Sequence, residues 1–212
     1  MSRSLILLLL LAVSVTVFLA TRSLKKNPAA RGGAIRDPKI LVCSLGDKPL
    51  AGIGDTDVTI YSRYSRRVDA TKAEGVSELI KVIGQGYGVV HLYAEINADG
   101  YLTDGRGAAL KGSELLEACR QSGVALLFFA SDNPPANYEK AFGPLPERPG
   151  GDGMNVVWTL KREGDKFTYF LDELLKRMAA GESMPLAWVH IAPQGQGPWM
   201  DKLPETVYLT NR

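Results

Sequence analysis

Cysteine and histidine are scarce in this chain of 212 residues, which contains two of each. Cys43 and Cys119 each lie in or beside an apolar run. No Cys-x-x-Cys pair and no mixed Cys/His cluster offers the ligands of a metal site. The sequence therefore predicts no metal and no other cofactor, and the two isolated thiols fit a reducing compartment.

A large excess of either charge is also lacking. The 25 Lys and Arg residues nearly balance the 23 Asp and Glu residues, which leaves a formal net charge of +2. No basic stripe interleaved with aromatic residues is present, although such a stripe is typical of nucleic-acid surfaces. We therefore expect no nucleic-acid partner.

The first 26 residues contain one almost wholly apolar run, from Leu5 to Ala20. The run is short for a membrane-spanning helix, but residues 21–24 can extend it while Arg22 reaches the interface. No small-x-small cleavage site follows it directly, and no cysteine follows it, which excludes a lipoprotein. We therefore favour an uncleaved membrane anchor at residues 1–26 over a cleaved signal peptide.

The flanking charges predict how the anchor is oriented. Five basic residues follow the apolar run and only Arg3 precedes it: Arg22, Lys25, Lys26, Arg31 and Arg36. The positive-inside rule then places the remainder of the chain in the cytoplasm, with an exported domain as the alternative. Residues 27–38, rich in Gly, Ala, Pro and Arg, are expected to form a flexible tether. Residues 39–212 have the length of one domain. The predicted location is the cell membrane, crossed once.

Apolar runs and helical periodicity alternate along this domain. Strands are expected at 39–43, 58–61, 89–96, 124–130, 155–160, 185–191 and 206–209. Helices are expected at 71–83, from an N-cap at Ser113 to Gly123, at 165–180 and, as a single turn, at 138–142. Gly84, Gly86 and Gly88 follow a helix and precede a strand, which is the reverse of the order in a dinucleotide-binding loop. The alternation predicts an α/β three-layer sandwich with a mainly parallel central sheet.

The stretch from Val124 to Asn133 is the one around which we expect a site to be organised. An apolar run of strand length ends in Ser131, Asp132 and Asn133, directly before two prolines. Polar residues that end a buried parallel strand lie at the carboxyl edge of the sheet, where α/β proteins bind ligands. The simpler interpretation is that these three residues only turn the chain.

Two strands of the domain resemble those of the CHAT domain of caspase-like cysteine peptidases. The resemblance rests on 89–95 (VVHLYAE), 127–131 (LFFAS) and the distal 178–183 (MAAGES), and it spans roughly residues 80–191. It implies a caspase-like topology. In that family the first strand ends in a catalytic His, and the later strand ends in Ala-Cys. His91 matches an earlier, non-catalytic His of the motif, while Glu95 occupies the position of the base and Ser131 that of the nucleophile.

Both chemical positions therefore depart from the family. A serine hydroxyl needs an oriented base, and a carboxylate is a weak one. On a single strand, His91 and Glu95 would share a face at about 13 Å, too far apart to form a dyad. For His91 and His190 alike we favour a packed or surface role over catalysis.

Three hypotheses follow. The first is a membrane-anchored, catalytically degenerate caspase-like domain that binds a protein or peptide and does so through His91, Glu95, Ser131, Asp132 and Asn133. The second is an active hydrolase with Ser131 as nucleophile, assisted by Glu95 or His91. The third is a module that binds a small molecule or nucleotide at residues 131–133.

Overall fold

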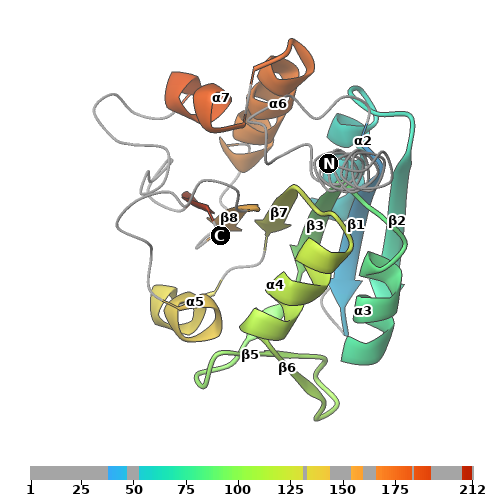
Figure 1. The fold of residues 1–212 in the computed structure, drawn as a ribbon, viewed down its shortest axis with the longest axis vertical. Coiled ribbons are helices and arrows are strands. Elements are labelled where there is room, and N and C mark those ends of the chain that lie inside the picture. The colour runs from blue at the N-terminus through green and yellow to red at the C-terminus, as the bar shows by residue number, and fades with distance from the viewer. Residues whose placement is uncertain are drawn as a thin grey trace, which may run out of the picture.

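A computed structural model describes residues 38–46, 53–130, 133–143, 154–159, 166–182, 184–191 and 207–211. Its centre is a six-stranded sheet with the order β2-β1-β3-β7-β8-β9 (Figure 1). The first five strands in this order are parallel to their neighbours, and β9 is antiparallel to β8. The strands are β1 (Ile40–Leu45), β2 (Val68–Ala73), β3 (Val89–Tyr93), β7 (Leu126–Phe129), β8 (Asn155–Thr159) and β9 (Val207–Asn211).

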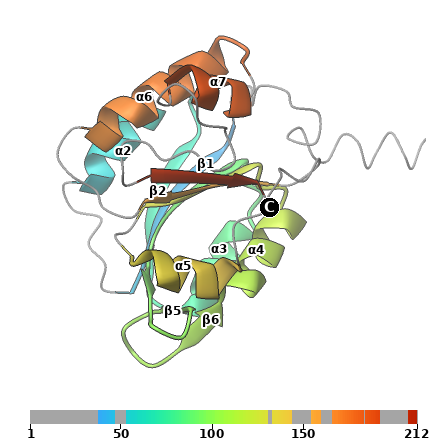
Figure 2. The same cartoon turned by 90° about the vertical axis from the view of Figure 1, so that its left-hand side faces the viewer.

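Helices cover both faces of this sheet, as Figure 2 shows edge-on. One face packs against α3 (Val76–Ile83), α4 (Gly112–Gln121) and α5 (Pro135–Phe142). The other packs against α2 (Ile53–Tyr61), α6 (Lys166–Ala179) and α7 (Met184–Ile191). Because both faces are covered, β1, β3 and β7 are buried at every residue, as their nearly continuous apolar sequences require. The predicted α/β sandwich with a mainly parallel sheet is confirmed.

Alternate residues of each central strand enter two separate cores. Leu92 and Phe129 belong to the core beneath α3, α4 and α5. Tyr93 and Phe128 belong to the core beneath α2, α6 and α7. This period of two places His91, which lies between Leu92 and Val90 in β3, on the face covered by α2 and α6.

A small antiparallel sheet follows β3 and consists of β4 (Glu95–Ile96), β5 (Tyr101–Thr103) and β6 (Ala109–Lys111). A turn at residues 97–100 joins β4 to β5, with Gly100 at φ 83° and its N–H donating to Asn97 O at 3.0 Å. The single strand expected at 89–96 is thus two strands in different sheets, which separate at Ala94. His91 and Glu95 do not share a strand, so the predicted separation along one does not apply.

The strand expected at 58–61 was wrong, because these residues form the second half of α2. Val58, Thr59 and Ile60 are β-branched and favour strands locally. In the folded chain, however, Ile60 and Tyr61 are buried at helical spacing with Asp57, and Thr59 Oγ1 donates to Asp55 O at 2.8 Å. Burial of one helix face outweighs the local preference.

The segment after α2 also differs from the prediction. The second strand, β2, runs from Val68 to Ala73 and includes residues expected to begin a helix at Thr71; α3 itself begins at Val76. As the edge strand of the sheet among the described residues, β2 carries exposed polar side chains and lacks the apolar run that marks the central strands.

The strand expected at 185–191 was also wrong, since Met184–Ile191 is the helix α7. A short apolar run does not distinguish a buried strand from a short helix. The helix expected to have its N-cap at Ser113 has it two residues earlier, at Lys111, and begins at Gly112. The helix at 165–180, the strand at 206–209 and the helical segment at 138–142 are confirmed as α6, β9 and part of α5.

Gly112 lies where α4 meets α5, and a Cβ there would be 2.2 Å from Ala141 O. We expect Gly112→Ala to lower the free energy of unfolding by about 1–3 kcal/mol, because backbone atoms must move to accept the methyl group. Urea denaturation measures the change. Gly84→Ala is the control, since its Cβ would be 3.4 Å from Lys81 O in right-handed helical backbone. A Gly112→Ala protein as stable as this control would contradict the packing described.

None of the helices in the described residues combines the length and the apolar character needed to cross a membrane. The predicted anchor at residues 1–26, and the tether up to residue 37, lie outside the described residues.

Candidate functional site

The site begins with two neighbouring parallel strands that end at the same edge. β3 pairs with β7 from Val89↔Leu126 to Leu92↔Phe129. The Ala130 N–H continues this pairing by donating to Leu92 O at 2.8 Å. The chain that leads to Glu95 and the chain that leads to residue 131 therefore leave the sheet side by side.

Asn133 joins these two chains where they leave the sheet. Its Oδ1 accepts a hydrogen bond from the Ile96 N–H at 2.8 Å, and its Nδ2 donates to Ala94 O at 3.3 Å. The side chain is only 3% exposed. By satisfying backbone groups on both sides of Glu95, Asn133 fixes the chain after β3 to the chain after β7.

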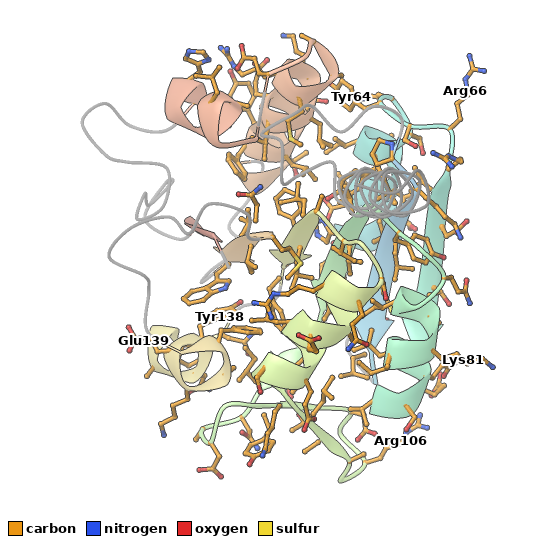
Figure 3. All side chains as sticks on the ribbon, in the orientation of Figure 1. Tyr64, Arg66, Lys81, Arg106, Tyr138 and Glu139 are labelled. Carbon is orange, nitrogen blue, oxygen red and sulfur yellow. The ribbon has the colours of Figure 1, made fainter. Side chains whose placement is uncertain are left out.

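Helix α5 packs against this edge and forms further hydrogen bonds with it. Asn133 Nδ2 also donates to the Tyr138 hydroxyl at 3.3 Å, and Asn137 Nδ2 donates to Ile96 O at 2.8 Å. The Tyr138 ring is fully buried and stacks on Trp158 at 5.1 Å between centroids and 7° between planes. Figure 3 shows Tyr138 directed from α5 toward the sheet. The edge is thus held by a packed aromatic cluster.

Among the predicted site residues that the structure describes, Glu95 is the one that is exposed at this edge. It opens β4 and pairs with Thr103 of β5. Its carboxylate is presented on a rigid support, since the neighbouring Ile96 is buried and bonded through both its N–H and its carbonyl. Ser131 and Asp132 lie outside the described residues, although Ala130, directly before Ser131, is buried at the end of β7.

His91 lies in the layer beneath α2, away from this edge. Its side chain is fully buried, its Nδ1 shares a 2.8 Å hydrogen bond with the Tyr61 hydroxyl, and its Nε2 is 3.1 Å from Asp57 Oδ2. The Tyr93 hydroxyl also donates to the Asp57 carboxylate. The imidazole stacks on Phe128 at 5.4 Å between centroids.

This cluster of Asp57, Tyr61, His91 and Tyr93 combines groups found in catalytic sites, but burial keeps it from substrates. Asp57 and His91 are 0% exposed. The arrangement connects α2 to β3 through buried hydrogen bonds and through the close approach of the Asp57 carboxylate to the His91 ring. Asp57 and Tyr61 could not be recognised as partners of His91 while residues 58–61 were expected to form a strand. As a helix, the segment carries these two residues at i and i+4, on one face.

His190 lies on α7, in the same helical layer. Its Nδ1 is 2.9 Å from Glu182 Oε2, and Arg177 is also within hydrogen-bonding distance of both side chains. The hydrogen bond from His190 holds the pKa of Glu182 below its usual value. Of the chain's two histidines, His91 is thus buried beneath α2 and His190 is exposed on α7.

Both thiols are buried and neither forms a disulfide. Burial raises the pKa of Cys43 and of Cys119 from 9.0 to about 12.

We expect neither thiol to react with an aromatic disulfide reagent at pH 8 until the chain is denatured, when two thiols per chain should react. Because both pKa values are raised in the folded state, the free energy of unfolding should fall as the pH rises from about 9 toward 12. Rapid reaction of the folded protein would contradict this burial.

A hollow of about 480 Å³ lies between α2 and α6, in the helical layer that also contains α7. It is lined by Asp55, Thr56, Thr59, Ile60, Arg63, Thr168, Tyr169 and Asp172. Glu95 and Asn133 do not line it. The hollow therefore gives no support to the small-molecule site expected at residues 131–133.

The structure thus brings Glu95 and Asn133 to one edge and places His91 on the opposite side of the sheet plane, beneath α2. No protein-family model and no curated protein sequence matches the chain.

Proposed function

We propose that this protein is a membrane-anchored, catalytically degenerate caspase-like domain that recognises a protein or peptide. The recognition surface is the edge where β3 and β7 end. Glu95 is its exposed charged group, Asn133 holds the surrounding backbone, and Ser131 and Asp132 follow β7 in the chain.

The observation that carries this proposal is the placement of the two histidines. A serine nucleophile needs a base oriented within hydrogen-bonding reach. His91 is enclosed with Asp57 and Tyr61, and His190 is paired with Glu182 on α7. The sequence contains no third imidazole to serve Ser131.

The positions of Glu95 and Ala130 support the caspase-like part of the proposal. A base and a nucleophile in that family would follow two strands whose ends must lie together. Here the chain segments that carry Glu95 and Ser131 follow β3 and β7, which are neighbours in register. The scaffold therefore suits a site made of two residues that follow neighbouring strands. Glu and Ser at the positions of the family's base and nucleophile do not suit peptidase chemistry.

Recognition is the use that the edge suits best. Binding groups are effective when a rigid scaffold holds them, because less conformational entropy is lost when the partner arrives. Glu95 stands between backbone groups fixed by Asn133 and Asn137. Its exposed carboxylate would accept hydrogen bonds from a Lys or Arg side chain of the partner.

Photo-crosslinking of the full chain in its own membranes tests this proposal. A photoreactive amino acid at position 103, opposite Glu95 in the β4–β5 pair, should capture a protein partner. Glu95→Lys should reduce the capture about tenfold or more, because it brings like charges together. Glu117→Lys is the matched control, since Glu117 is exposed on α4 and the charge change is identical. Capture that is equal in both variants would overturn the proposed role of Glu95.

A further inference from the structure

We infer that the hollow between α2 and α6 is a binding site for a guanidinium group on an aliphatic stem, the chemistry of an arginine side chain. The two helices lie side by side on one face of the sheet, as Figure 1 and Figure 2 both show. No described residue of the recognition surface lines this hollow. The inference therefore does not depend on the proposed function.

The charge of the lining favours a cation. Asp55 and Asp172 line the hollow together with one basic residue, Arg63, which leaves one negative charge in excess. Among the described residues, the Asp55 carboxylate takes part in no hydrogen bond or ion pair, and only its backbone carbonyl accepts, from Thr59 Oγ1. A carboxylate with both oxygens available can accept two parallel N–H bonds from a planar guanidinium, which an ammonium group cannot match.

The second carboxylate is held in place by its neighbours. Asp172 Oδ1 accepts hydrogen bonds from the Tyr64 hydroxyl at 2.8 Å and from Arg63 Nη1 at 3.3 Å. Burial and then the bond to Asp172 raise the pKa of Tyr64 to about 12, so its hydroxyl keeps the donated proton at neutral pH. Within the described part of the chain, neither bond uses Asp172 Oδ2. Because the carboxylate is fixed before a ligand arrives, less conformational entropy is lost on binding.

An aromatic ring and an apolar base complete the hollow. Tyr169 lines it and is 71% exposed, whereas Phe170, the next residue of α6, is 3% exposed and belongs to the core. The face of an exposed ring attracts a guanidinium through a cation–π contact. Ile60 also lines the hollow but is 2% exposed, so it offers an apolar surface to the aliphatic stem.

The size of the hollow and its ligand set distinguish an organic cation from a metal ion. Its volume of about 480 Å³ falls within the range of about 300–1,000 Å³ that is typical of small-molecule pockets. Among the described residues, no group of three or more Asp, Glu, His or Cys could hold a metal. Two carboxylates fall short of the roughly six to eight oxygen ligands that Ca²⁺ takes. An organic cation is therefore the better fit.

Isothermal titration calorimetry of the full chain with N-acetyl-arginine amide tests the inference. We expect a dissociation constant of about 1 mM or tighter, which a ligand of this size can reach. N-acetyl-citrulline amide has nearly the same shape without the charge, and it should bind about tenfold more weakly or worse. N-acetyl-lysine amide keeps the charge but lacks the planar fork, so its affinity should lie between the two.

Substitutions locate the bound cation. Asp55→Asn should weaken binding of N-acetyl-arginine amide about tenfold or more, because it removes the unpaired carboxylate. Tyr169→Leu should weaken it about two- to fivefold, since leucine keeps apolar area but loses the ring. Asp99→Asn and Tyr101→Leu make the same changes in the turn before β5 and at the start of β5, and should leave the affinity unchanged.

Butylguanidine distinguishes two sources of the guanidinium group. If it binds as tightly as N-acetyl-arginine amide, the hollow recognises only the head and the stem, which a free small molecule supplies. If the blocked arginine binds about tenfold more tightly, its peptide groups contribute and the source is a protein side chain. Either result supports the site.

Other results would overturn the inference. These are equal affinity for the arginine and citrulline amides, no detectable binding of the arginine amide, and an Asp55→Asn protein that binds as well as Asp99→Asn. Affinity that is lost in Glu95→Gln and kept in Asp55→Asn would place the cation at the recognition surface instead. Loss of partner capture at position 103 with normal arginine binding would refute the proposed function and leave the hollow as a site.

Discussion

Asp57→Ala is expected to lower the free energy of unfolding by about 3–5 kcal/mol, because it leaves a buried imidazole and the Tyr93 hydroxyl without their carboxylate. The pair joins α2 to the middle of β3, with Asp57 Oδ2 3.1 Å from His91 Nε2 and both side chains fully buried. The loss should therefore detach α2 as well as destabilise the core. Chemical denaturation gives the free energy, and hydrogen exchange at α2 amides gives the local effect.

Asp55→Ala is the matched control, since Asp55 lies on the same helix but is exposed. It should cost about 1 kcal/mol or less, the usual contribution of an acidic residue in the first turn. Replacing Asp57 and His91 together by leucine should recover only part of the loss, because it removes the imidazole that has lost its carboxylate but not the cost of the lost hydrogen bonds from Tyr61 and Tyr93. If Asp57→Ala were as mild as Asp55→Ala, the cluster would not connect α2 to the sheet.

Asn133→Leu is expected to cost about 2–5 kcal/mol and to abolish partner capture at the edge. The substitution leaves the Ile96 N–H and Ala94 O without the side chain that satisfies them, and each unsatisfied buried group costs about 1–3 kcal/mol. Leucine has the same branched arrangement and number of side-chain heavy atoms as asparagine, so the substitution opens no cavity and its effect reports the lost hydrogen bonds. The stability change is measured by denaturation, and capture by the crosslinker at position 103.

Two further variants separate the parts of this effect. Asn133→Asp keeps the oxygen that accepts from Ile96 but loses the donor to Ala94, and should lie between wild type and Asn133→Leu. Asn137→Ala removes one partly buried bond to Ile96 O and should cost about 0.5–1.5 kcal/mol. An Asn133→Leu protein with full stability and full capture would show that Asn133 does not hold the edge.

The sequence was sufficient to predict the central strands, since β1, β3 and β7 are buried on both faces and consist of nearly continuous apolar runs. It was insufficient at α2 and α7. At α2 the local preference of Val58, Thr59 and Ile60 for a strand is overruled by burial of the helix face that carries Asp57, Ile60 and Tyr61. At α7 a run of eight mainly apolar residues is compatible with either element.

The end of β7 was predictable, because a strand end is visible as a change from apolar to polar residues. Glu95 was singled out only by the resemblance to the CHAT domain, since the strand was expected to continue to residue 96. The role of Asn133 was not predictable, because its bonds to Ala94 and Ile96 span 39 and 37 residues of chain. His91 was expected to have a packed or surface role. Its partners could not be predicted, because Asp57 and Tyr61 face β3 only when their segment forms a helix.

The most direct test of the account is the reactivity of Ser131 toward a serine-directed fluorophosphonate in the folded, full-length protein. Wild type and Ser131→Ala should be labelled equally and weakly, because the chain's two imidazoles are held by Asp57 and Tyr61 on one hand and by Glu182 on the other. Labelling at Ser131 that the substitution abolishes, together with ester or peptide hydrolysis lost in the same variant, would contradict the account.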